Sequence, residues 1–188
     1  MRPLFSVHAG EFLVGNEIES RFPGAILWLP AKDTGVDLLV TNRDRSRSVS
    51  LQVKYSRNFA DLHPGMTACS WFKLQRTKVL NSAADLWIFV LWSPTGRTER
   101  THYVVIPPKE LVKRLSKIHG HEDSIHSYFW VTGKRLCWEG RGLKRAEEIL
   151  MAEGQYRNPL RDFTAHLDAW GLLGSRLGTR VGRVPKGV

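Results

Sequence analysis

The chain has few cysteines and no long hydrophobic run. Two cysteines, Cys69 and Cys137, occur among 188 residues, too few for a disulfide framework or a cysteine-type zinc site. Reduced thiols are therefore expected. No apolar stretch reaches the roughly 20 residues of a membrane-spanning helix, and the N-terminus lacks an apolar signal segment. We expect a cytoplasmic protein without a membrane partner.

Several catalytic motifs are also missing. The chain has no GxxxxGK phosphate loop, so nothing indicates ATP hydrolysis. No serine lies in a nucleophile-elbow context, and Cys69 has no histidine partner within a motif. The histidines His119, His121 and His126 lack the helical i, i+4 spacing of a zinc-binding pair, and a solvated loop explains them better.

Positive charge is in excess. The chain has 28 Lys and Arg against 18 Asp and Glu, a formal net charge of +10. A basic protein attracts polyanions, of which nucleic acid is the commonest. We expect DNA as the partner, with RNA left open. The residues predicted to contact its phosphates are Arg43, Arg45, Arg47, Lys73, Lys144 and Arg145. Each cluster, taken alone, is also explained as solvated surface.

The length is sufficient for one domain with a sizeable core. We expect a single domain over residues 1–173 and a basic, flexible tail over 174–188, which is rich in Gly and Arg. Helical and strand-like segments alternate along the chain. This pattern predicts an α/β fold in which helices flank a central mixed β-sheet.

Residue periodicity predicts the individual elements. An N-terminal helix runs from Ser6 to before Pro23. The segment 55–69 is loop-like, and 85–92 is a central strand covered on both faces. Further strands are expected at 25–29, 36–40, 49–54, 101–106, 127–132 and 135–138, and further helices at 71–83, 107–118, 143–151 and from 158 onward.

Two neighbouring strands carry polar residues on one face. Because side chains in a strand alternate between faces, Asp37 points away from Val36, Leu38 and Val40. In the next strand Gln52 and Lys54 point away from the apolar residues Val49, Leu51 and Val53.

A hairpin with its turn at 44–45 would place Asp37 opposite Gln52. A carboxylate, a carboxamide and the ammonium of Lys54 then lie within a few ångströms of one another. Such a cluster is a poor core and is well suited to holding a divalent metal and a water.

The N-terminal helix contributes an acid. At a period of 3.6, an apolar stripe passes through Val7, Val14, Ile18 and Phe22. Glu11 and Gly15 fall inside this stripe. We interpret Glu11 as directed at whatever the helix packs on and Gly15 as allowing close approach. The alternative is that the helix dipole simply favours an acid in the first turn.

The order Glu11, Asp37, then Gln52-Val53-Lys54 resembles the PD-(D/E)XK nuclease superfamily, which has the restriction-endonuclease-like fold. Its small prokaryotic members related to archaeal Holliday-junction resolvases are especially similar. The resemblance covers roughly the first half of the chain. Two departures are present: Gly35-Val36-Asp37 replaces the family's Pro-Asp, and Gln52 replaces an acid.

The resemblance implies an endonuclease that hydrolyses DNA with Mg²⁺ or Mn²⁺. The metal ligands would be the side chains of Asp37, Gln52 and Glu11 with the backbone carbonyl of Val53. Lys54 would orient the attacking water or stabilise the developing charge. A homodimer is considered because paired cuts by this superfamily often imply two copies.

Two alternatives stay open. Asp37 and Lys54 could form an ordinary ion pair on a polar-faced hairpin. The chain could also be a non-catalytic nucleic-acid-binding module that retains the nuclease fold. The second alternative depends on Gln52, since it removes one negative charge from the metal site.

Overall fold

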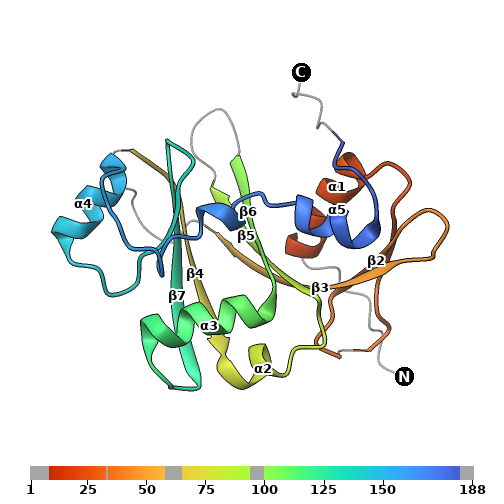
Figure 1. The fold of residues 1–188 in the computed structure, drawn as a ribbon, viewed down its shortest axis with the longest axis horizontal. Coiled ribbons are helices and arrows are strands. Elements are labelled where there is room, and N and C mark those ends of the chain that lie inside the picture. Colours follow the sequence, from red (N-terminus) through yellow and green to blue (C-terminus); the bar gives the residue numbers. More distant parts are fainter. Residues whose placement is uncertain (1–8, 33, 58–64, 94–99, 183–188) are drawn as a thin grey trace.

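The computed structural model describes residues 9–32, 34–57, 65–93 and 100–182. Its elements along the chain (Figure 1) are α1 (Ala9–Arg21), β1 (Ile26–Trp28), β2 (Leu38–Thr41), β3 (Ser48–Arg57), β4 (Met66–Gln75), α2 (Arg76–Leu80), β5 (Leu86–Ser93), β6 (Arg100–Ile106), α3 (Pro108–His119), β7 (Ser124–Thr132), β8 (Cys137–Glu139), α4 (Arg145–Glu153), the 3₁₀ helix η1 (Thr164–His166) and α5 (Gly171–Leu177).

The strands form two sheets. The larger sheet has five strands in the order β1-β2-β3-β5-β6. Its β3 and β5 are parallel and its other neighbours are antiparallel, so the sheet is mixed. The predicted α/β class with a mixed central sheet is confirmed. A second, antiparallel sheet of three strands, β4-β7-β8, was not predicted.

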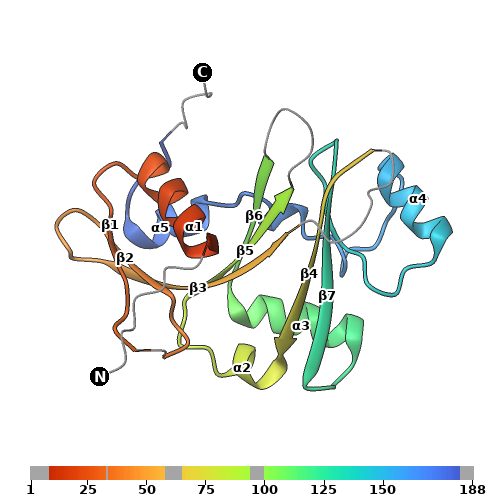
Figure 2. The same cartoon turned by 180° about the vertical axis from the view of Figure 1, so that it is seen from behind.

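The central strand β5 has a hydrophobic cluster on each face. Leu86, Ile88 and Val90 belong to the cluster beneath α1 and α5. Trp87, Phe89 and Leu91 belong to the cluster beneath α3 and the smaller sheet. Figures 1 and 2 both place α1 beside α5, away from α3. The strand predicted to be covered on both faces is therefore confirmed.

Helix α1 packs on β3 through its first turn. Val14, Ile18 and Phe22 are buried as predicted, while Val7 lies outside the described residues. A Cβ placed on Gly10 would lie 2.6 Å from Cβ of Tyr55, whereas one on Gly15 would meet only Leu27 Cδ1, at 3.5 Å. The close approach predicted at Gly15 is therefore at Gly10.

The predicted helix over 71–83 is wrong for most of its length. β4 continues to Gln75, and α2 is confined to Arg76–Leu80. Phe72 and Leu74 are buried while Lys73 is exposed, which is the alternation of a half-buried strand. β4 also begins at Met66, and β3 ends at Arg57, so both strands enter the predicted loop 55–69; residues 58–64 lie outside the described part of the chain.

The helix predicted from residue 158 onward is also wrong. Asn158 Oδ1 accepts the backbone N–H of Leu160, and Asp162 Oδ1 accepts that of Thr164, so side chains organise turns here in place of a helix. The segment contacts the sheet edges through bridges between Trp138 and Asp162 and between Val104 and Leu167.

The first residues of the predicted tail belong to the packed domain. Gly174 and Leu177 are buried in α5. The backbone N–H of Gly182 donates to the carbonyl of Arg21, at 2.7 Å. The boundary predicted at residue 173 therefore falls inside a helix. Residues 183–188 lie outside the described part of the chain.

Candidate functional site

The pairing of β2 with β3 has the predicted register. Leu38 lies opposite Leu51, and Leu39 lies opposite Ser50. The backbone N–H of Asp37 donates to the carbonyl of Leu51, at 2.8 Å. The regular pairing ends at Leu38 and Leu51, so it does not extend to Asp37 and Gln52. The two side chains nevertheless meet, because the amide of Gln52 donates to Oδ2 of Asp37.

Asp37 is held by two donors from β3. Its Oδ2 accepts the side-chain amide of Gln52 and the backbone N–H of Val53, the latter at 2.6 Å. β2 begins only at Leu38. The carboxylate thus accepts from a backbone N–H of β3 just beyond the paired part of β2, which fixes its position.

Two oxygen atoms of this pair are left for another partner. Among the described residues, none donates a hydrogen bond to Oδ1 of Asp37 or Oε1 of Gln52. Both belong to side chains that contact each other through the Gln52 amide. Carboxylate and carboxamide oxygens are ligands of hard cations such as Mg²⁺, which usually keeps several waters. The donor set therefore fits such a cation, with a single carboxylate as the charged ligand of the pair.

Lys54 extends from β3 on the same side of the sheet as Gln52. Its Nζ lies 5.5 Å from the centroid of the Trp87 ring, a cation–π contact. Within the described part of the chain Lys54 forms no ion pair, with Asp37 or any other acid. The interpretation of Asp37 and Lys54 as a surface ion pair is therefore wrong.

Glu11 lies in α1, which packs on the other face of the sheet. It follows Gly10, which contacts β3 at Val53 and Tyr55, and those side chains point opposite to Gln52 and Lys54. Glu11 is half-buried in the first turn of α1. The structure brings Asp37, Gln52 and the backbone of Val53 into direct contact and places Glu11 near the same stretch of β3.

The remaining described residues offer no acidic or histidine-rich alternative. They contain no group of three or more His, Cys, Asp or Glu side chains arranged to hold a metal ion. None of their helices is long and apolar enough to cross a bilayer.

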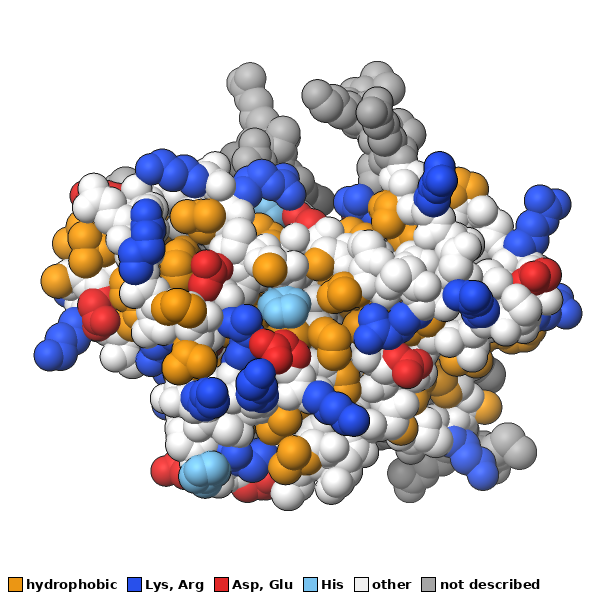
Figure 3. Space-filling view, viewed as in Figure 1, with side chains coloured by type: hydrophobic (Ala, Val, Ile, Leu, Met, Phe, Trp, Pro, Cys, Tyr) orange, Lys and Arg blue, Asp and Glu red, His pale blue; other side chains and the backbone are white. Residues whose placement is uncertain are grey.

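The six predicted phosphate-contacting residues do not form one surface. Arg43, Arg45 and Arg47 are exposed in the β2–β3 turn, whereas Lys144 and Arg145 begin α4. Figures 1 and 2 both place this turn and α4 at opposite ends of the long axis. Figure 3 shows Lys and Arg side chains spread over the face viewed, with Asp and Glu between them. Lys73 is exposed on β4, opposite His126.

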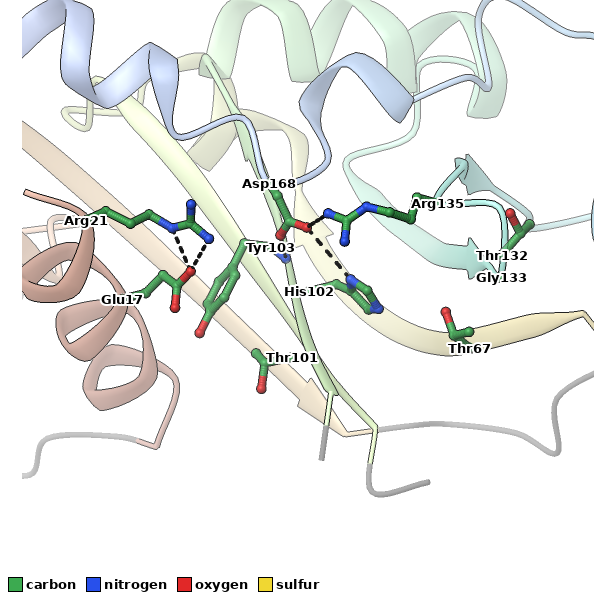
Figure 4. A pocket seen from close by; sticks show the side chains of 10 residues that line it. All are labelled: Glu17, Arg21, Thr67, Thr101, His102, Tyr103, Thr132, Gly133, Arg135 and Asp168. Atoms are coloured by element: carbon green, nitrogen blue, oxygen red, sulfur yellow. Dashed lines mark hydrogen bonds and ion pairs between the residues drawn. The ribbon is translucent and has the colours of Figure 1, made fainter. Parts of the chain in front are cut away.

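A polar cleft of about 620 Å³, which the sequence did not indicate, lies between α1, β6 and the β7–β8 turn (Figure 4). Arg135 donates to Asp168 Oδ2 at 2.7 Å, and His102 Nδ1 lies 3.8 Å from the same oxygen. On the α1 side of the cleft, Arg21 forms an ion pair with Glu17.

Asp168 also forms two hydrogen bonds with Tyr103. Its Oδ1 accepts the backbone N–H of Tyr103, and its own backbone N–H donates to the carbonyl of Tyr103, so Asp168 attaches this segment to the edge strand β6. The residues that line this cleft come from segments far apart in the sequence, so no local motif indicates it.

Comparison of the chain with models of protein families, with curated proteins and with solved structures found no match in any of the three. The case for a function therefore depends on the residues and their geometry.

Proposed function

We propose that the protein is a metal-dependent endonuclease of the PD-(D/E)XK type that hydrolyses phosphodiester bonds in DNA. The observation that carries the proposal is the pair formed by Asp37 and Gln52, whose Oδ1 and Oε1 are available to a cation, with Lys54 two residues further along β3. The mixed sheet flanked by helices supports the restriction-endonuclease-like fold.

Each residue has a separate task in this proposal. Asp37, fixed by the N–H of Val53, would be the principal metal ligand, with Gln52 Oε1 and the Val53 carbonyl beside it. A bound Mg²⁺ or Mn²⁺ supplies a water of lowered pKa and screens the phosphate charge. Lys54, a compact cation without an acidic partner among the described residues, would orient the water or stabilise charge that develops on the phosphate.

Gln52 sets the expected metal preference. Its amide is neutral, so the site has one negative charge fewer than a pair of acids would provide. We expect weak Mg²⁺ binding and a preference for Mn²⁺. The presence of glutamine at position 52, in place of an acid, also favours the second candidate, a nucleic-acid-binding module that does not cleave.

A substrate panel separates the two candidates. Wild type, Asp37→Ala and Lys54→Ala are incubated with plasmid, linear, single-stranded and branched DNA, and with RNA, in Mg²⁺ or Mn²⁺. The nuclease proposal expects cleavage that both variants lose. Binding without metal-dependent cleavage of every substrate supports the non-catalytic module. Affinity for nucleic acid that is absent or insensitive to salt contradicts both.

A further inference from the structure

The five-stranded sheet has a polar side around Asp37 that continues onto β1. Side chains directly opposite each other on paired strands share a face. Trp28 lies opposite Leu39, and Leu39 lies opposite Ser50. Trp28 therefore shares its side of the sheet with Gln52 and Lys54. We call this side, over β1, β2 and the facing part of β3, the open face.

The open face is accessible at the β1 edge. The other side of the same strands is packed: Leu38, Val40 and Leu51 belong to the cluster beneath α1 and α5. On the open face, Trp28 is 44% exposed and Ser48 is exposed. A large aromatic side chain therefore stands at a solvent-facing position of an edge strand.

The Trp28 ring is held in place from two directions. Its Nε1 donates to Thr41 Oγ1 at 3.2 Å. The guanidinium carbon of Arg45 lies 5.8 Å from the ring centroid, a cation–π contact. An indole with an adjacent guanidinium presents the flat surfaces on which nucleobases stack.

The turn that carries Arg45 is ordered by its own hydrogen bonds. Arg45 has a φ of 59° and donates its N–H to the carbonyl of Asn42, at 3.0 Å. Asn42 Oδ1 accepts the N–H of Arg47, at 3.0 Å. Ser46 donates to Asp44 through its N–H and its hydroxyl, and these bonds lower the pKa of that carboxyl. The guanidinium is thus positioned before any ligand binds.

The charges of this region suit a phosphate backbone. Arg43, Arg45 and Arg47 are all exposed in the turn. The turn's acid, Asp44, is engaged by Ser46. Asp85, at the far side of the open face, is likewise engaged by the N–H and hydroxyl of Ser50.

Trp28 is close to the proposed catalytic residues. Its partner Leu39 is two residues from Asp37, which corresponds to about 7 Å along a strand, and neighbouring strands are about 5 Å apart. A nucleic acid strand at Asp37 can therefore contact Trp28 without a change in the sheet.

We propose that Trp28 and Arg45 stack an unpaired base of the nucleic acid whose backbone lies at Asp37, so the substrate contains a single-stranded segment. This inference rests on the proposed function. Bases inside a duplex are stacked on each other and cannot offer a face to an indole on a flat sheet. An unpaired base can, whatever its sequence.

Binding measured without metal tests the inference. The affinity for a fluorescein-labelled 20-mer of thymidine and for a 20-base-pair duplex is determined by anisotropy in EDTA at one salt concentration. The variants are Trp28→Ala, Trp28→Phe and Arg45→Asn, the last because Asn tolerates a positive φ. The matched controls are Phe12→Ala, an exposed aromatic on α1, and Arg180→Asn, an exposed arginine of the C-terminal segment.

We expect Trp28→Ala to weaken single-strand binding between about 5-fold and about 100-fold, the range for one base stack. Duplex binding changes little, Trp28→Phe retains most of the affinity, and the controls behave as wild type. Equal losses on both DNAs, or no loss, overturn the inference. A change of oligomeric state in Trp28→Ala without a loss of affinity would assign the face to contacts between copies and also overturn it. Because binding is measured in EDTA, these outcomes do not depend on nuclease activity. They can be interpreted even if the protein does not cleave DNA.

Discussion

The side-chain amide of Gln52, on β3, donates to Oδ2 of Asp37, the residue immediately before β2. This hydrogen bond engages Oδ2 without removing the negative charge of the carboxylate, and no described residue donates a hydrogen bond to Oδ1. Gln52 thus holds the acid in place, and no described residue donates a hydrogen bond to its own Oε1. The identity of residue 52 therefore affects both the charge of the site and the way in which the Asp37 carboxylate is held.

Replacing Gln52 by an acid should strengthen metal binding. Gln52→Glu adds a negative charge beside Asp37, and we expect Mg²⁺ affinity to rise at least about tenfold, equivalent to about 1.4 kcal/mol. Isothermal titration of Mg²⁺ measures the change. Gln75→Glu, at an exposed position at the end of β4, is the matched control and should leave affinity unchanged. Unchanged affinity in Gln52→Glu counts against a metal site here.

The packing of α1 against β3 predicts opposite effects at two glycines. Gly10→Ala places a methyl group 2.6 Å from Cβ of Tyr55 and should destabilise the protein by about 1 to 3 kcal/mol. Gly15→Ala meets ordinary contact distances and should stabilise it by about 0.5 to 1 kcal/mol through helix propensity. Urea unfolding measures both. Equal effects at the two positions would show that the close approach does not occur.

A buried acid in the smaller sheet should be essential for stability. The Glu139 side chain is 0% exposed, and its carboxylate lies 2.6 Å from Arg161 Nη1 and 3.1 Å from His119 Nε2. Removing one partner of a buried ion pair leaves an uncompensated charge, so Glu139→Ala should cost about 3 to 5 kcal/mol. The free energy of unfolding is compared with that of Glu122→Ala, an exposed acid. Similar values for the two variants would be inconsistent with a buried pair.

The central sheet and the register of β2 with β3 were accessible from sequence because both depend on short-range alternation. The alternation of Gln52 and Lys54 with apolar residues predicts the face on which each β3 side chain lies. The position of the turn at residues 44–45 predicts which residues of β2 and β3 pair. Val36 is the exception: it precedes β2 and packs with the cluster containing Trp87, not with Leu38.

Elements that depend on distant partners were not predictable in the same way. The spacing within residues 71–83 predicts a helix, whereas the strand β4 depends on pairing with β7, some fifty residues later, where Trp71 lies opposite Tyr128. The segment after Asn158 has helix-like apolar spacing but is held by side-chain turns and edge bridges. The closeness of Gly10 to β3 depends on tertiary packing that periodicity does not encode.

The two thiols should be unreactive in the folded protein. Burial, with a smaller contribution from Glu148, raises the pKa of Cys69 to about 12, and burial likewise raises the pKa of Cys137. Almost no thiolate is then present at pH 8. Titration with an aromatic disulfide reagent should detect no thiol in native protein and two after denaturation. Rapid labelling of native Cys69 would contradict the burial.

The most direct test of the nuclease site is the rate of plasmid nicking in Mn²⁺ by wild type and by Lys54→Met, with Lys117→Met, an exposed lysine of α3, as the control. Methionine keeps the length of the side chain and removes its charge. The account predicts metal-dependent nicking by wild type and the control, and a loss of at least about 100-fold in Lys54→Met, because stabilisation of developing charge is worth about 3 kcal/mol or more. Equal nicking rates for all three proteins would contradict it.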